Sequence, residues 1–146
     1  MYKFELSIFI NRPVQEVFDY VTNPANYAKW SSGIQSAEWT SDGPPGVGST
    51  VKGVAKFLGR KIEFVTEITG WDPPNLWSVK SVGGPLPLES TSKFEGQGDG
   101  TLVTETSQIE IGGFFNLAEG LVGKQFQKQL EAERAALKLL LESGQV

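Results

Sequence analysis

Polar and apolar residues alternate from the start of the chain. The even-numbered positions are apolar: Tyr2, Phe4, Leu6, Ile8 and Ile10. Lys3, Glu5 and Ser7, which alternate with them, are polar. Successive side chains of a β-strand point to opposite faces, so this pattern predicts a half-buried strand over residues 2–10.

The spacing of apolar residues then changes from two to three or four. Val14, Val17, Phe18 and Val21 follow this helical spacing. We expect a short helix that is capped by Asn11 and has Pro13 near its first turn. The pair Asn23-Pro24 ends this helix and starts a second helical turn, which runs through Tyr27 to Trp30.

The middle of the chain has the pattern of a strand meander. Runs of strand-forming residues are separated by turns rich in glycine, proline, asparagine and aspartate. The expected strands are 34–40, 50–57, 60–69, 76–82, 88–95 and 101–111. Their connections are too short for parallel crossovers, so the seven strands are expected to form an antiparallel sheet. The segment 96–100 is read as a turn rather than a phosphate-binding loop, because no helix follows it.

Residues 116–142 are predicted to form one long amphipathic helix. Its apolar face consists of Phe115, at its start, and Ala118, Val122, Phe126, Leu130, Ala136, Leu137 and Leu140. The opposite face carries Lys124, Lys128, Glu131, Lys138 and Glu142. Such a helix needs a sheet to cover its apolar face, because an isolated helix is only marginally stable in water.

The composition excludes several classes of function and is compatible with the predicted fold. The 146 residues suit one domain, residues 1–146, with a core that requires no disulfide. The chain has no histidine and no cysteine, which excludes Ser-His-Asp and Cys-His catalysis and the usual zinc sites. We therefore expect neither metal nor cofactor. The net charge of −4 gives no footprint for nucleic acid. With neither a signal peptide nor an apolar span visible, a cytoplasmic protein is expected.

Several segments together resemble a known superfamily. They are INRPVQEVFDYVTNPANYAKWSSGI near the start, GPPGVGS, VTEITGWDPPNLW, GDGTLVTET, and LEAERAALKLLLES near the end. In this order they are similar to the START-like (SRPBCC) superfamily, which contains the Bet v 1-like and the polyketide cyclase/dehydrase and lipid transport proteins. The resemblance covers nearly the whole chain.

The resemblance implies an α+β helix-grip fold. A curved seven-stranded antiparallel sheet would surround a long C-terminal helix, with two short helices after the first strand and a hydrophobic cavity between sheet and helix. Cyclases of this group are expected to place His, Arg, Tyr or Trp side chains in the pocket. A histidine-dependent mechanism cannot be carried over, because this chain has no histidine.

Two polar residues interrupt the apolar face of the long helix. Gln129 and Glu133 lie one turn apart, so each either contacts a polar ligand group, pairs inside the protein or marks where the helix meets solvent. A desolvated Glu133 would be the first candidate for an acid or base, and no other catalytic residue is proposed. Trp30 is expected either to wall the pocket or to anchor the short helices, and these roles are compatible.

Further aromatic and aliphatic side chains complete the expected ligand-binding set. Beside Trp30, Gln129 and Glu133, this set contains Phe57, Phe64, Trp77, Phe94, Phe115, Val122, Phe126 and Leu130. Phe114 and Phe115 follow two glycines, and they form either a lid over the cavity or ordinary packing at the start of the helix. The segment 83–88 is a second candidate for the cavity rim.

The remaining carboxylates are assigned by strand alternation. Glu63 and Glu67 are expected on the solvent face of their strand. Glu105 and Glu110 fall on opposite faces of the last strand, so one of them points inward unless a bulge intervenes; the sequence leaves open which one.

Three functions fit these features, and the sequence does not decide between enzyme and non-enzyme. The leading hypothesis is binding or transport of a small hydrophobic molecule, such as a lipid or a polyketide-like aromatic. The second is a cyclase or dehydratase in which Glu133 abstracts a proton while Tyr20 or Tyr27 donates hydrogen bonds. The third is a protein-interaction module of the co-chaperone type, which would show an exposed apolar patch.

Overall fold

One antiparallel sheet of seven strands forms the body of the computed structural model, which describes all residues from 1 to 146. The strand order is β1-β7-β6-β5-β4-β3-β2, so the chain meanders from β2 to β7 and the first strand adds to the last. The strands are β1 (Tyr2–Ile10), β2 (Ile34–Trp39), β3 (Thr50–Phe57), β4 (Arg60–Asp72), β5 (Leu76–Gly83), β6 (Leu88–Gln97) and β7 (Gly100–Ile109). The predicted seven-stranded α+β fold is confirmed, with strand ends that differ by a few residues.

The alternation of apolar and polar residues in β1 is matched by an alternation of buried and exposed side chains. In β1, Phe4, Leu6 and Ile10 are buried while Lys3 and Glu5 are exposed. Leu6 lies opposite Glu105 of β7 in the β1–β7 register. The inner face of the sheet therefore receives the apolar side chains of β1 together with the odd-numbered residues of β7.

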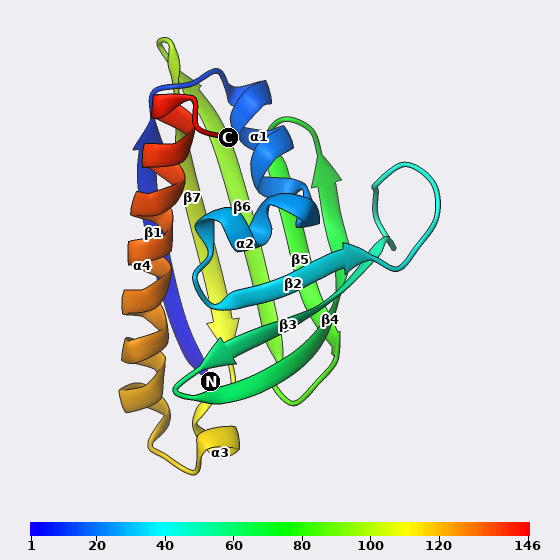
Figure 1. Ribbon diagram of the computed structural model, residues 1–146, viewed down its shortest axis with the longest axis vertical. Helices are drawn as coiled ribbons and strands as arrows, with labels where there is room; N and C mark the ends of the chain where they lie inside the picture. Colours follow the sequence, from blue (N-terminus) through cyan, green and yellow to red (C-terminus); the bar gives the residue numbers. More distant parts are fainter.

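The sheet curves most strongly on its β2–β4 side. The register shifts between Ile34 and Ser36 of β2 and at two places in β4, between Val65 and Thr66 and between Ile68 and Gly70. Such bulges bend a strand and increase its twist. Figure 1 shows the consequence: β2, β3 and β4 sweep across the front of the other strands, and the concave side faces α4 (Glu119–Ser143).

Short helices cover the end of the concave face that lies near the C-terminal end of α4. They are α1 (Val14–Thr22), the 3₁₀ turn η1 (Pro24–Asn26) and α2 (Tyr27–Trp30). The prediction that Asn11 caps α1 is wrong, because Pro13 occupies the N-cap position and the helix begins at Val14. Asn11 instead donates its backbone N–H to Oε2 of Glu142 at 2.8 Å, which ties the β1–α1 turn to the end of α4.

The long helix starts three residues later than predicted. Asn116 has a left-handed conformation (φ 55°, ψ 42°), which separates the short helix α3 (Gly112–Phe115) from α4. The carboxylate of Glu119 accepts the backbone N–H groups of Ile111 and Gly112 at 2.8 and 2.7 Å. These bonds, chiefly that from Ile111, lower the pKa of Glu119 and fix the turn that replaces the expected first helical turn.

Two hydrophobic clusters fasten α4 near its two ends. One cluster holds Leu137 and Leu141 against Ile10, Phe18 and Phe94. The other holds Val122 against a group that includes Phe4, Leu6, Phe57, Ile62, Ile109 and Ile111. Phe126 and Leu130 pack partly against the second cluster, and between the two regions the helix carries Gln129, Glu133 and Arg134.

The buried face of α4 is narrower than predicted. Val122 and Leu137 are buried, and Phe126 and Leu130 are half-buried. Ala118 and Ala136 are exposed, so their assignment to the core face is wrong. Ala136 precedes Leu137 by one residue and so lies about 100° away around the helix axis. Leu141, one turn beyond Leu137, takes the buried place instead.

Gly123 sets how closely α4 approaches β1. A Cβ atom at this position would overlap the ring of Tyr2, whose hydroxyl donates to Oε1 of Gln127 at 2.6 Å. We therefore expect Gly123→Ala to lower the free energy of unfolding by about 1–3 kcal/mol through overpacking, measured by urea denaturation.

Gly120→Ala is the matched control for this prediction. Gly120 lies in the same helix, and a Cβ atom there would meet no atom within 4 Å. This change should leave stability unchanged or raise it by up to about 1 kcal/mol, because alanine favours the helix. Equal effects of the two substitutions would contradict the proposed contact.

Candidate ligand-binding cavity

Two adjoining chambers lie between the concave face of the sheet and the middle of α4. Their volumes are about 190 and 180 Å³. They share part of their walls, and the residues that line both are Ser31, Ile34, Phe64, Thr66, Leu88, Phe126, Leu130 and Glu133. The chambers therefore form two parts of one site, each large enough to hold several non-hydrogen atoms.

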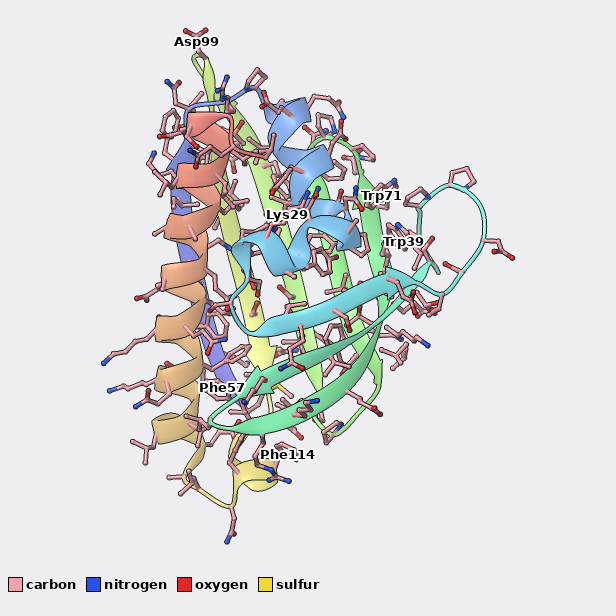
Figure 2. The ribbon with its side chains drawn as sticks, viewed as in Figure 1. Lys29, Trp39, Phe57, Trp71, Asp99 and Phe114 are labelled. Atoms are coloured by element: carbon pink, nitrogen blue, oxygen red, sulfur yellow. The ribbon has the colours of Figure 1, made fainter.

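The first chamber is apolar. It lies toward α3 and is walled by strand residues and by the β5–β6 loop. Its own lining includes Ala55, Phe57, Ile62, Leu86, Ile109 and Ile111. Figure 2 shows Phe57 at the same end of the molecule as Phe114 of α3. Gly83, Leu86 and Leu88 contribute to the wall, so the segment 83–88 lies at the cavity as expected.

The second chamber also has a mainly apolar wall, but it carries an ion pair and several hydrogen-bonding side chains, and for these groups we call it the polar chamber. Tyr27 and Trp30 enter it from α2, Trp77 from β5, and Glu105 from β7, while Arg134 enters from α4. The rings of Trp30 and Trp77 each lie 6.3 Å from the ring of Tyr27, measured between centroids. Three aromatic residues thus meet a charged pair inside the protein.

Arg134 and Glu105 form a buried ion pair across this chamber. Nη2 of Arg134 donates to Oε1 of Glu105, and the two side chains are only 12% and 9% exposed. The hydroxyls of Ser90 and Ser107 donate to the other carboxylate oxygen at 3.0 and 2.7 Å. Burial lowers the pKa of Arg134 to about 10, which leaves its guanidinium charged at neutral pH.

Glu133 joins α4 to the loop that follows α2. Its carboxylate accepts the hydroxyl of Ser31 at 2.8 Å, the backbone N–H of Gly33 at 3.2 Å and the side-chain amide of Gln129 at 3.0 Å. The hydroxyl of Ser32 lies farther away, at 3.4 Å. Glu133 is 3% exposed, so these internal donors replace the water that the carboxylate has lost. Of the three roles considered for Glu133, the structure shows internal pairing.

Three side chains that line the second chamber each carry a buried N–H group without a partner. The groups are Nε1 of Trp30, Nε1 of Trp77 and Nη1 of Arg134. The guanidinium carbon of Arg134 lies 5.1 Å from the ring of Trp30, so the unpaired donors come from neighbouring side chains. Buried donors are normally satisfied, so these three are exceptions. Surrounding side chains shield the three N–H groups, which are not open to the chamber.

The family comparison agrees with this architecture. The sequence profile of the family described as "Polyketide cyclase / dehydrase and lipid transport" matches residues 1–142. The chain belongs to this family. No curated protein matches the sequence.

Solved structures that share the fold extend over the whole chain. TTHA0849 from Thermus thermophilus has a TM-score of 0.82 at 22% identity and covers 99% of this chain and 100% of its own. A START superfamily protein from Mycobacterium smegmatis has a TM-score of 0.82 at 15% identity, with coverages of 98% and 99%. The di-domain ARO/CYC BexL from the BE-7585A biosynthetic pathway has a TM-score of 0.72 at 16% identity and matches over 97% of this chain and 49% of its own. At these identities the likeness shows the fold alone.

Most of the residues that the sequence predicted to bind a ligand line the cavity. Trp30 and Trp77 line the second chamber, and Phe57 and Gln129 line the first. The residues that border both are Phe64, Phe126, Leu130 and Glu133. Glu63 is exposed at the edge of the first chamber, whereas Glu67 is half-buried and lies 3.9 Å from Lys80. None of the helices has the length and hydropathy needed to cross a membrane.

Three expected residues lie outside the cavity wall. Phe94 packs edge-to-face on Phe18 with 5.1 Å between centroids, and Val122 is buried against the second hydrophobic cluster. The ring centroids of Phe115 and Phe57 lie 5.5 Å apart, and Phe115 does not line the cavity. Neighbouring Phe114 carries the guanidinium of Arg60 over its ring at 3.9 Å. α3 is therefore packed against the apolar chamber as its backing layer.

Arg134 is the residue that sequence reasoning missed. It lies three residues before Leu137, which places it about 60° from the centre of the buried face. Glu105 was identified only as one of two alternatives, and the structure shows that it points inward while Glu110 is exposed. The sequence could have indicated that Glu105 points inward, because apolar Val103 and Ile109 lie on the same face of the strand.

Removing one charge of the Arg134–Glu105 pair should destabilise the protein more than replacing both residues with apolar ones. Glu105→Gln leaves the Arg134 guanidinium buried without its counter-charge, so we expect it to reduce the free energy of unfolding by about 3 kcal/mol or more. The double change Glu105→Leu with Arg134→Met removes both charges and should be closer to the wild type. Urea denaturation followed by circular dichroism measures both. If Glu105→Gln were as stable as the wild type, the pair would be solvated rather than buried.

Proposed function

We propose that this protein binds a small, largely hydrophobic molecule in the cavity between the sheet and α4. The observation that supports this most directly is the pair of adjoining, mainly apolar chambers with a shared wall, of which the second also carries charged and hydrogen-bonding groups. Sites for small molecules are mostly apolar with a few placed polar groups, which is the arrangement found here. The family description, with its reference to lipid transport, supports the same proposal.

The apolar chamber supplies the affinity in this proposal. Burying apolar surface contributes roughly 25 cal/mol per Å². The bound molecule would place its apolar body among Phe57, Ile62 and Leu86. The hydrophobic clusters at both ends of α4 hold the helix over this space without filling it.

A role as a cyclase or dehydratase has weaker support. That hypothesis assigns proton abstraction to Glu133, whose carboxylate already accepts hydrogen bonds from Ser31, Gly33 and Gln129. Tyr20 does not line either chamber. Burial raises the pKa of Tyr27, so its phenol stays protonated and suits hydrogen-bond donation rather than acid–base exchange. The interaction-module hypothesis remains untested.

Filling the cavity should abolish binding without unfolding the protein. Leu130 lines both chambers, so in Leu130→Trp the larger side chain would occupy the space of the ligand. With the fluorescent probe N-phenyl-1-naphthylamine, we expect saturable binding to the wild type and affinity at least about tenfold weaker in the variant, a loss of about 1.4 kcal/mol. Circular dichroism checks that the variant is folded.

The same helix provides a matched control. Leu139 is 69% exposed on the outer side of α4, so Leu139→Trp should bind the probe as the wild type does. Should Leu130→Trp fail to fold, Leu88→Trp makes the same test from β6, because Leu88 also borders both chambers. A folded cavity variant with wild-type affinity would disprove binding in this cavity.

A further inference from the structure

Three exposed leucines lie at the end of the molecule that carries α3. Leu58 lies in the turn between β3 and β4, Leu117 follows α3, and Leu121 lies in the first turn of α4; they are 49%, 50% and 59% exposed. The β3–β4 turn is joined directly to α3, because Nη1 of Arg60 donates to the backbone carbonyl of Phe114 at 2.6 Å. Figure 1 shows this turn, α3 and the start of α4 together at the lower end of the molecule.

Leu58 has a backbone conformation that favours other residues. Its φ is 50° and that of Gly59 is 79°, so both central residues of the turn are left-handed. Hairpin turns of this kind favour asparagine followed by glycine, and a leucine in the first position is strained. Leu58 is half in water, so packing in the core does not explain it. An exposed apolar residue kept in a strained turn points to a contact outside the chain.

The surface beside these leucines is positively charged. Lys56 and Lys61 lie directly opposite each other in the β3–β4 register, where like charges destabilise a strand pair, and neither forms an ion pair. The segments 56–63 and 110–128 carry five basic and three acidic residues, although the chain as a whole has a net charge of −4. One of the three acidic residues, Glu119, accepts two backbone N–H groups of the protein itself.

An anionic lipid bilayer matches this combination of groups. Its surface attracts lysine and arginine side chains, and the boundary between its headgroups and acyl chains accepts exposed leucines. A nucleic acid would pair with the lysines but would leave the leucines in water. The tip of a two-residue turn is also narrow, so it can enter a headgroup layer without a shaped pocket to receive it.

The apolar chamber lies next to the same end. Phe57, which precedes Leu58, lines this chamber, as does Ile111 just before α3. Lys56 and Glu63 line it too and are exposed, so the chamber wall extends to the surface beside the β3–β4 turn. A bilayer bound at this end would therefore lie close to the chamber.

We propose that the end of the molecule formed by the β3–β4 turn, α3 and the start of α4 binds the surface of an anionic lipid bilayer. The three exposed leucines enter the boundary between headgroups and acyl chains. Lys56, Lys61 and Lys124, which is exposed one turn after Leu121, contact lipid phosphates. The inference goes beyond the proposed function and does not depend on it, because a bilayer can be bound while the cavity is empty.

Vesicle flotation with the full chain tests the inference. It compares vesicles of phosphatidylcholine alone with vesicles that also contain phosphatidylglycerol. We expect binding to the anionic vesicles to be on the order of tenfold tighter than to the neutral ones and to weaken as salt is added, because part of it is electrostatic. Equal binding to both vesicles would overturn the inference. Binding to neither, as expected if the partner is an acidic protein, would overturn it as well.

The substitution Leu58→Asn separates bilayer contact from folding. Asparagine suits the left-handed turn, so the melting temperature should stay the same or rise. Affinity for anionic vesicles should fall about tenfold with the loss of the apolar side chain. Val47→Asn is the matched control, because Val47 is 71% exposed in the β2–β3 loop, which Figure 1 shows projecting away from α3. A Leu58→Asn protein with wild-type affinity for vesicles would contradict the proposed contact.

A charge reversal tests the lysines. Lys61→Glu should weaken binding to anionic vesicles about fivefold or more. Lys93→Glu makes the same change in net charge at an exposed position in the middle of β6, and it should have a much smaller effect. Equal losses in the two variants would show that only the net charge matters and would contradict a binding surface at the α3 end.

Binding of N-phenyl-1-naphthylamine without vesicles separates this inference from the proposed function. Leu58 and Lys61 line neither chamber, so both variants should bind the probe as the wild type does. Probe binding without vesicle binding would overturn the inference and leave the proposed function standing. Vesicle binding without probe binding would support the inference and count against the proposed function.

Discussion

The ion pair between Arg134 and Glu105 fixes how α4 sits on the sheet. Two opposite charges that are only 12% and 9% exposed must stay together, because separating them would leave a charge without solvent or counter-ion. The pair joins the middle of the helix to β7 and so sets the rotation of the helix about its own axis. With this rotation, Val122, Leu137 and Leu141 point into the two hydrophobic clusters and Glu133 reaches the loop after α2.

The cavity follows from that placement. Apolar side chains fill the contact between sheet and helix where α4 begins and where it ends, but its middle carries Gln129, Glu133 and Arg134. These side chains make hydrogen bonds along the walls and do not fill the space as leucine or phenylalanine would. The bulges of β2 and β4 bend strands that contribute Ile34 and Thr66 to the cavity wall. The contact between sheet and helix is thus packed at the two ends of α4 and leaves a cavity at its middle.

Much of this was predictable from local patterns. Alternation predicted the strands, and the spacing from Val122 to Leu137 predicted the buried helix face, because both depend on which side of an element a residue occupies. The break at Asn116 was not predictable in this way, since it depends on Glu119 bonding to the backbone of Ile111 and Gly112. Arg134 was missed for a similar reason: an arginine on a helix is normally exposed, and only its distant partner in β7 accounts for its burial.

The most direct test observes the tryptophan indole N–H groups by NMR during titration with N-phenyl-1-naphthylamine. The chain has four tryptophans, which give four resolvable signals. If the ligand binds in the cavity, the signals of Trp30 and Trp77, which line the second chamber, should shift and saturate together with binding, while that of Trp39, which lines neither chamber, stays in place. Saturable binding without a shift of either signal would show that the ligand binds outside this cavity and would contradict the account.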